Sequence, residues 1–201
     1  MATQQQLTIP MFPLNMVLLP GETKTLHIYE ERYKQLVSDC LLNEAHFGIP
    51  FVHQKSVGDY GIEVKINHII KTFDNGEMDI MIEGVKVFKL VEFSSVLSPK
   101  LYGAGIINHE QDFNAKASSY LQQLTKDYMW VSQHNALQEE AFDNANVYSI
   151  ARLLDISSLE KYDLIKADTL TKKENLLKAK IKLFIHLIKT EHDLQAKFIL
   201  N

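Results

Sequence analysis

The distribution of glycine and proline divides the chain into two parts with different folding possibilities. All eight glycines and all five prolines lie before residue 106. Turn residues between short runs of Ile, Val, Phe and Tyr are typical of strands, whereas a stretch without Gly or Pro can form long helices. The sequence therefore predicts an α+β fold, with a strand-rich subdomain over 1–111 and an α-helical bundle over 112–201 that ends in a long helix.

The clearest strand signal is the alternation of apolar and polar residues over 62–73. The Asp74–Gly76 sequence that follows favours positive φ at a tight turn, and the alternation resumes at Met78, so a hairpin is predicted. Further strands are predicted over 85–93, beginning after Gly84, and over 102–108. Together these strands would close a small barrel-like sheet.

One helix is predicted inside the strand-rich part, over 30–43. Its apolar residues recur every three or four positions, as on one helix face (Tyr33, Leu36, Val37, Cys40 and Leu41). We expect Cys40 to be a small buried hydrophobe, because no nearby cluster of Lys, Arg or metal ligands would lower the pKa of its thiol.

In the second half, Asp112 or Asn114 can cap a helix over 115–132, and a second helix is predicted over 139–154. Two sequences have the capping-box form and each predicts a helix start: Ser157 to Glu160, and Thr171 to Glu174. The last helix carries two neighbouring apolar stripes, so we expect it to pack on other helices or on a partner (Leu177, Ile181, Phe184 and Ile188; Leu176, Leu183 and Leu187).

Composition and charge narrow the function classes. With 46% hydrophobic and 23% charged residues, the chain is an ordinary globular sequence. A net charge of −4 disfavours nucleic acid as a partner, because phosphate affinity comes from clustered Lys and Arg. No export signal and no apolar run of membrane-spanning length is present, so no membrane association is expected. The single cysteine cannot form an intramolecular disulfide, which fits a cytoplasmic location.

An ordered set of short motifs carries a family resemblance. The segments 10–14, 17–21 and 26–33, followed by 47–49, 58–61 and 83–85, resemble the amino-terminal, substrate-binding domain of the Lon protease family, particularly its stand-alone branch. The shared motif residues are Pro13, Pro20, Gly21, Glu30, Arg32, Tyr33 and Gly84. The resemblance implies a PUA-like β-barrel or sheet with one inserted helix, followed by a helical bundle.

Most of these motif residues suit structural roles. Pro20 and Gly21 fit a turn, Glu30 at the start of a helix is favoured by the helix dipole, and Arg32 and Tyr33 can tie that helix to the sheet. Family members often carry Arg three residues after Gly84, where this chain has Val87. No role of that arginine is therefore transferred.

No catalytic signature is present. The G-x-x-x-x-G-K-[ST] phosphate loop is missing, and the sequence ends at Asn201, before a Ser-Lys protease domain could begin. We therefore expect no enzymatic activity, no catalytic residue and no cofactor. The eight histidines show no metal-ligand spacing, so no metal site is expected, and His68 on the apolar strand face is expected to be a hydrogen-bonded core residue.

The resemblance implies a protein-binding module for unfolded or partly folded polypeptide or for a partner such as a Lon-type protease, and it is compatible with a homo-oligomer. The candidate contact residues are apolar or aromatic and suit a core equally well (Met11, Phe12, Tyr29, Phe51 and Phe73). The alternative is a small-ligand or RNA-binding PUA-like domain. Eight lysines over 160–189 form either a solvated face or a docking surface for an acidic partner.

Overall fold

The computed structural model describes residues 6–110, 115–132 and 144–199. The chain forms two compact units. The first contains Met1–Asp112 and Ile156–Lys166, and the second contains Phe113–Asp155 and Ala167–Asn201. A single boundary after residue 111 does not include this return, because Ile156–Lys166 belongs to the same unit as the strands.

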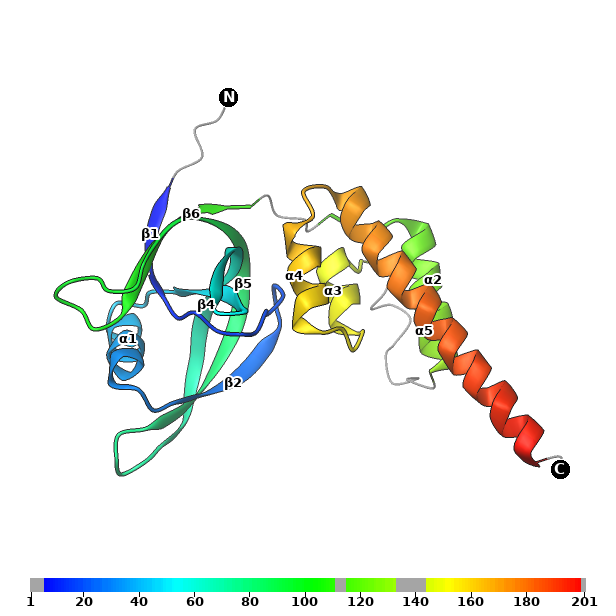
Figure 1. The fold of residues 1–201 in the computed structure, drawn as a ribbon, viewed down its shortest axis with the longest axis horizontal. Helices are drawn as coiled ribbons and strands as arrows, with labels where there is room; N and C mark the ends of the chain where they lie inside the picture. Colours follow the sequence, from blue (N-terminus) through cyan, green and yellow to red (C-terminus); the bar gives the residue numbers. More distant parts are fainter. Residues whose placement is uncertain (1–5, 111–114, 133–143, 200–201) are drawn as a thin grey trace. The chain divides into compact units, whose positions relative to one another are not determined.

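The first unit is built on six strands, and Figure 1 shows them curling into a barrel (β1 Leu7–Met11, β2 Thr23–Ile28, β3 Phe47–His53, β4 Ser56–Thr72, β5 Met78–Ser94 and β6 Gly103–His109). The strand order is β2-β5-β4-β3-β1-β6, and an additional pairing of β5 with β6 closes the barrel. β1 and β3 are parallel, whereas the other pairs are antiparallel. The α+β fold predicted from the sequence is confirmed.

β5 is one long strand, so the prediction of a separate strand after Gly84 was wrong. The residues Met78 to Glu83 pair with β2, and the stretch from Phe88 to Ser94 pairs with β6. Gly84 lies within β5 because of a close approach: a Cβ there would come within 2.4 Å of the Leu19 carbonyl oxygen. The glycine therefore serves backbone contact and not chain reversal.

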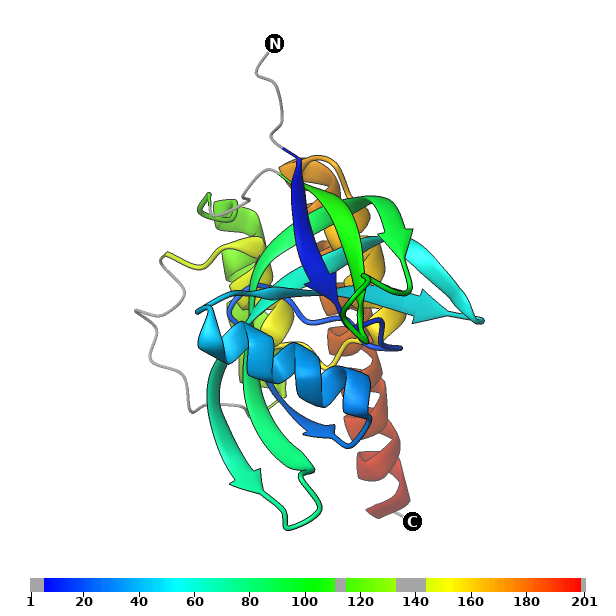
Figure 2. The same ribbon diagram turned by 90° about the vertical axis from the view of Figure 1, so that its left-hand side faces the viewer.

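The alternation in the β4–β5 hairpin fills the core as predicted, because Ile62, Val64, Ile80 and Ile82 are all fully buried. His68, in contrast, is exposed, so its prediction as a core histidine was wrong. The β4–β5 register shifts between Ile66 and His68, and such a bulge changes which face the following side chains occupy. In Figure 2 the outer ends of β4 and β5 extend beyond the barrel as a two-stranded arm.

The inserted helix is α1 (Glu31–Leu42), as predicted. It buries Tyr33, Leu36, Val37 and Cys40, whereas Leu41 is exposed. Cys40 is the expected buried hydrophobe, and burial raises the pKa of its thiol to about 11. A thiol held neutral in this way is a poor nucleophile.

A short helix from late in the sequence, α4 (Ser158–Lys166), completes the first unit. Its predicted capping box is confirmed: the Ser157 amide and hydroxyl donate to the Glu160 carboxylate at 2.7 and 2.8 Å, and the Glu160 amide donates back to Ser157 Oγ. Lys161 forms an ion pair with Glu22 at 2.5 Å, and the Tyr162 ring lies 4.8 Å from the ring of Phe51.

The second unit contains α2 (Ser119–Val131), α3 (Val147–Arg152) and α5 (Leu170–Ile199). Ser118 caps α2; the predicted caps Asp112 and Asn114 lie outside the described residues. The helix predicted over 139–154 begins at Val147 in the described part, where Asn146 and Ser149 form a capping box, while 139–143 lie outside the described residues.

The predicted capping box at Thr171 was wrong, because α5 already begins at Leu170. The Thr169 hydroxyl accepts a hydrogen bond from the amide of Lys172 at 3.3 Å and thus caps the helix two residues before the predicted position. Glu174 instead accepts hydrogen bonds from the Ser118 amide and hydroxyl, both at 2.7 Å. The Glu174 carboxylate, which the capping-box pattern placed at the helix start, is therefore engaged in a tertiary contact with Ser118.

The two predicted apolar stripes of α5 have different environments. Leu177 and Ile181 of the first stripe are buried, and the Phe184 ring lies 5.8 Å from that of Tyr128 in α2. The second stripe, Leu176, Leu183 and Leu187, is exposed. Helix packing within the unit therefore covers one stripe only. None of the helices in the described part of the chain has the length and apolarity needed to span a membrane.

Candidate functional site

The five candidate contact residues fall into two groups. Met11, Phe12 and Phe51 are buried; Met11 packs with Phe88 and Ile107 in the barrel core. Tyr29 is 61% exposed and Phe73 is half-buried. Only Tyr29 and Phe73 therefore offer much surface to a partner, and both lie near the carboxyl end of β2.

A cleft opens at this end of β2, with a volume of about 130 Å³. Its walls come from the segment after β1, the end of β2 and the start of α1 (Phe12, Leu14, Leu26, His27, Ile28, Tyr29, Glu30 and Tyr33). The lining is mainly apolar and aromatic, with a polar rim at His27 and Glu30. A volume of this size accommodates about one large apolar side chain.

Ring contacts hold the aromatic walls of the cleft. Phe12 stacks on Tyr33 with ring centroids 3.7 Å apart, which explains why the Tyr33 motif position joins α1 to the barrel. On the outer side, the His27 ring stacks at 6.1 Å from Tyr29 and meets Phe73 edge-on at 5.7 Å. The exposed Tyr29 ring therefore stands on a supported aromatic surface.

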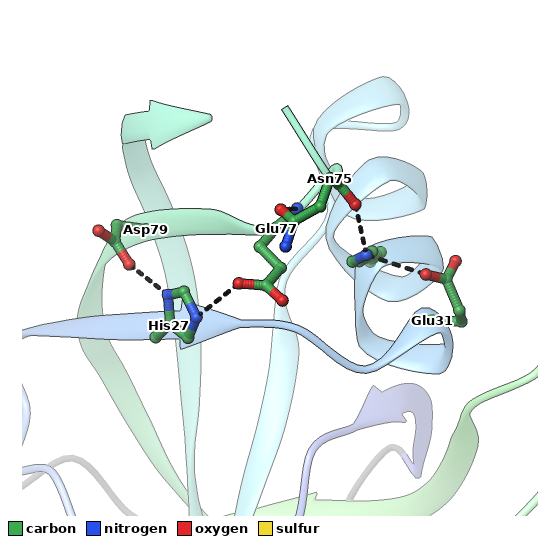
Figure 3. Close-up of polar contacts among 6 residues, drawn as sticks. His27, Glu31, Asn75, Glu77 and Asp79 are labelled. Carbon is green, nitrogen blue, oxygen red and sulfur yellow. Dashed lines mark hydrogen bonds and ion pairs between the residues drawn. The ribbon is translucent and has the colours of Figure 1, made fainter. Parts of the chain in front are cut away.

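His27 is fixed by two carboxylates from β5 and the turn before it (Figure 3). Its Nδ1 lies 2.7 Å from Asp79 and its Nε2 lies 3.2 Å from Glu77. Both ring nitrogens face acceptors, an arrangement that the doubly protonated imidazolium satisfies best. The hydrogen bond to Asp79, supported by Glu77 and by both negative charges, raises the pKa of His27.

Two further cations beside the cleft also have acidic partners. Arg32 pairs with Glu30 at 2.7 Å and lies 4.6 Å from the centroid of the Tyr33 ring. Lys34 pairs with Glu31 at 2.9 Å and donates to the Asn75 carbonyl at 3.2 Å, which links α1 to the hairpin turn (Figure 3). The cleft is therefore apolar, and the charges around it are balanced.

The other motif residues shape the chain before β2. Gly21 has φ +73°, a conformation that favours glycine, and its amide donates to the Gly84 carbonyl at 2.7 Å. Pro20 precedes it at this turn, and Pro13 lies between the cleft residues Phe12 and Leu14. Val87, which stands where the family often has Arg, is buried. These positions support the cleft indirectly by fixing the loop beside it.

A second polar cluster lies between strands: Glu63 of β4 contacts His46 at 2.6 Å and also pairs with His109 of β6. Sequence spacing gave no sign of this cluster, because the three residues come from separate parts of the chain. Within the described ranges no three His, Cys, Asp or Glu residues are grouped so that they could hold a metal ion. Through these two contacts Glu63 joins β4 to β6 and to the residue before β3.

Sequence reasoning missed four residues that line the cleft: Leu14, Leu26, His27 and Ile28. His27 and Leu26 lie in the 26–33 motif, but alternation in a short strand does not reveal which residues line a surface hollow. Leu14 lies in a segment without regular structure, apart from an isolated bridge to Phe51. Leu14 belongs to the 10–14 motif, but no alternation or helical period marked it as a residue that lines a cleft.

The first unit is a β-barrel with an inserted helix, it carries an aromatic cleft at the end of β2, and the chain continues into a helical unit. A family model described as the ATP-dependent protease La (LON) substrate-binding domain matches residues 8–189. The chain belongs to this family, as its motifs indicated.

Two solved structures support the fold. A Lon N-terminal domain protein from Xanthomonas campestris has 23% identity and a TM-score of 0.68, covering 85% of this chain and 97% of that one. The N-terminal domain of Mycobacterium avium complex Lon protease has 12% identity and a TM-score of 0.65, covering 87% and 98%. No curated protein sequence matches the chain.

Proposed function

We propose that this chain is a non-catalytic module that binds unfolded or partly folded polypeptide, and that the cleft at the end of β2 takes an apolar side chain of the bound segment. The exposed Tyr29 ring beside an apolar hollow is the observation that carries the proposal. The name of the matched family, a substrate-binding domain, points in the same direction.

The size of the cleft supports a flexible ligand over a folded one. Burial of one large apolar side chain contributes about 1.5–3 kcal/mol, and part of this is offset by the loss of ligand freedom. A single cleft of this kind therefore binds weakly and needs little sequence specificity. Both properties suit a module that samples many unfolded chains and gains affinity from repeated contacts.

The charge balance of the rim supports an apolar polypeptide over an anion. His27, Arg32 and Lys34 each face a carboxylate of the same surface, so they offer little net positive potential to phosphate. An uncharged apolar side chain needs no charged partner, so the pairing of these cations does not weaken its binding. We further propose a cytoplasmic location, a Lon-type protease as one partner, and homo-oligomers as a second assembly to test.

Tyr29→Ala tests the proposal. We expect it to weaken the binding of a fluorescently labelled polypeptide, kept unfolded by alkylation of its reduced cysteines, by about tenfold, because about 1–2 kcal/mol of aromatic contact is lost. The measurement is fluorescence anisotropy at constant salt, with circular dichroism to show that the variant is folded.

Tyr120→Ala is the matched control, since Tyr120 is 55% exposed but lies on α2 in the second unit. It should leave the affinity unchanged. Equal affinity of wild type and Tyr29→Ala would remove the cleft from the proposal, and no binding by the folded wild-type protein would overturn the function itself.

A further inference from the structure

β2 has a partner on one side only. Its six residues pair with β5, from Thr23 opposite Glu83 to Ile28 opposite Met78. Among residues 6–110, 115–132 and 144–199, no other segment pairs with it. In Figure 1, β2 runs along β5 at the rim of the barrel. An unpaired strand edge carries backbone donors and acceptors that can receive a further strand.

The hydrogen bonds identify which residues of β2 present this edge. The Gly84 amide donates to the Glu22 carbonyl at 2.9 Å, in the same register as the β2–β5 pairing. Because hydrogen-bonded pairs alternate along antiparallel strands, the backbone groups of Thr23, Thr25 and His27 point away from β5. In the described chain, no hydrogen bond outside the sheet engages the backbone of these three residues.

The free edge and the cleft belong to the same strand. Leu26, His27 and Ile28 line the cleft, and the exposed Tyr29 follows directly. A strand added along β2 would therefore run past the cleft, with one of its side chains within reach of the hollow. Alternate side chains of an extended segment point to the same face, which matches a site with one pocket and a row of backbone groups.

We propose that β2 binds its ligand by strand addition: an extended, uncharged apolar segment pairs with the backbone of Thr23, Thr25 and His27 and places one side chain in the cleft. The inference rests on the proposed function and specifies how that function is performed. The 130 Å³ cleft takes one side chain and not the face of a helix, and the paired charges of its rim suit a neutral occupant. The recognised class is extended polypeptide with free backbone amides.

Thr25→Pro tests strand addition directly. Proline removes the outward amide of residue 25 and places its ring in the path of an added strand, while β5 still pairs with the neighbouring residues. We expect the affinity for the labelled unfolded polypeptide to fall by about tenfold. Thr25→Ala, which changes only the exposed side chain, should bind within about twofold of wild type.

A second measurement uses the wild-type protein and does not depend on how the proline variant folds. Three apolar peptides of equal sequence are compared: one is unmethylated, and each of the other two carries N-methyl groups on alternate residues, so that a different backbone edge cannot donate in each. Strand addition predicts that methylation of one of the two edges weakens binding by about tenfold, whereas methylation of the other does not.

The outcomes separate this inference from the proposed function. One outcome would overturn strand addition and leave the proposed function intact. In this outcome Tyr29→Ala loses binding, Thr25→Pro binds like wild type, and wild type binds both methylated peptides as tightly as the unmethylated one. Absence of binding by wild type would overturn both. If wild type forms dimers that Thr25→Pro dissociates, the edge is occupied by a second copy of this chain, which also overturns the proposal.

Discussion

His27 lies between two carboxylates on an exposed surface. Its ring also contacts the Tyr29 ring, which lines the cleft. Asp79 and Glu77 hold both ring nitrogens, while Tyr29 and Phe73 contact the ring itself. The raised pKa of His27 means that folding favours the protonated imidazole. The Tyr29 ring therefore packs on a side chain whose protonated form the neighbouring carboxylates favour.

At the residue scale, this arrangement predicts a pH dependence. Because the folded-state pKa lies above the ordinary value of 6.5, the stabilisation by His27 is complete below pH 6.5 and is lost as the pH rises through the folded-state value. The difference in free energy of unfolding between wild type and His27→Gln should be larger at about pH 5.5 than at about pH 8.5.

An NMR titration of the His27 ring gives an independent check. Asp79→Asn should lower the pKa of His27 toward its ordinary value, because Asp79 makes the largest contribution to the shift. The same pKa in wild type and in Asp79→Asn would show that the hydrogen bond to Asp79 does not hold the proton.

At the scale of elements, Glu174 joins α5 to the start of α2. Its buried carboxylate accepts from the amide and hydroxyl of Ser118 and from Lys178, all at 2.7 Å. Burial acts to raise the pKa of Glu174, but the hydrogen bonds from Lys178 and Ser118 outweigh it, so the pKa is lowered. The charged form therefore stabilises the packing of the two helices.

Glu174→Ala should lower the free energy of unfolding by about 1–3 kcal/mol, because it leaves buried donors without an acceptor. Glu174→Gln, which retains one acceptor oxygen, should cost less. The contribution is present above pH 4.5 and is lost as the pH falls through the folded-state pKa, so the wild-type advantage should shrink in acid. Urea unfolding followed by circular dichroism measures both effects; an advantage independent of pH would contradict the assignment.

At the scale of the whole molecule, the chain enters the second unit, returns to the first for α4, and leaves again. Tyr162 of α4 contacts Phe51, and its hydroxyl lies where a side chain at Gly58 would point. The Lys161–Glu22 pair joins residues separated by 139 positions. The stability of the barrel therefore depends on a segment from late in the sequence.

Tyr162→Ala should destabilise the protein by about 1 kcal/mol or more, since an aromatic pair is worth about 0.5–1.5 kcal/mol beyond its buried area. Tyr162→Phe, which keeps the ring, is the matched control and should retain most of the stability. A fragment ending at residue 111 should unfold at lower urea concentration than the barrel of the full chain. Equal stability of fragment and full chain would support the simple division at residue 111.

Local patterns were sufficient for several elements of this protein. Alternation determined the β4–β5 hairpin, a three- and four-residue period determined α1, and the Ser157 capping box determined the start of α4. These signals operate between residues that are close in sequence, so they do not depend on how the rest of the chain folds. The ordered motifs likewise indicated the family from the amino-acid sequence alone.

Only the tertiary structure decided which aromatic residues are on the surface. Tyr29 and Phe51 were both candidate contact residues, yet Tyr29 is exposed beside a cleft and Phe51 is buried against Tyr162. Likewise, Glu174 accepts hydrogen bonds from Ser118 and not from the predicted helix start. β2 is an edge strand because β5 uses its other side to pair with β4, and its later residues to pair with β6. Burial and strand pairing depend on contacts between segments that are far apart in the chain. A local sequence period does not predict which distant segments come into contact.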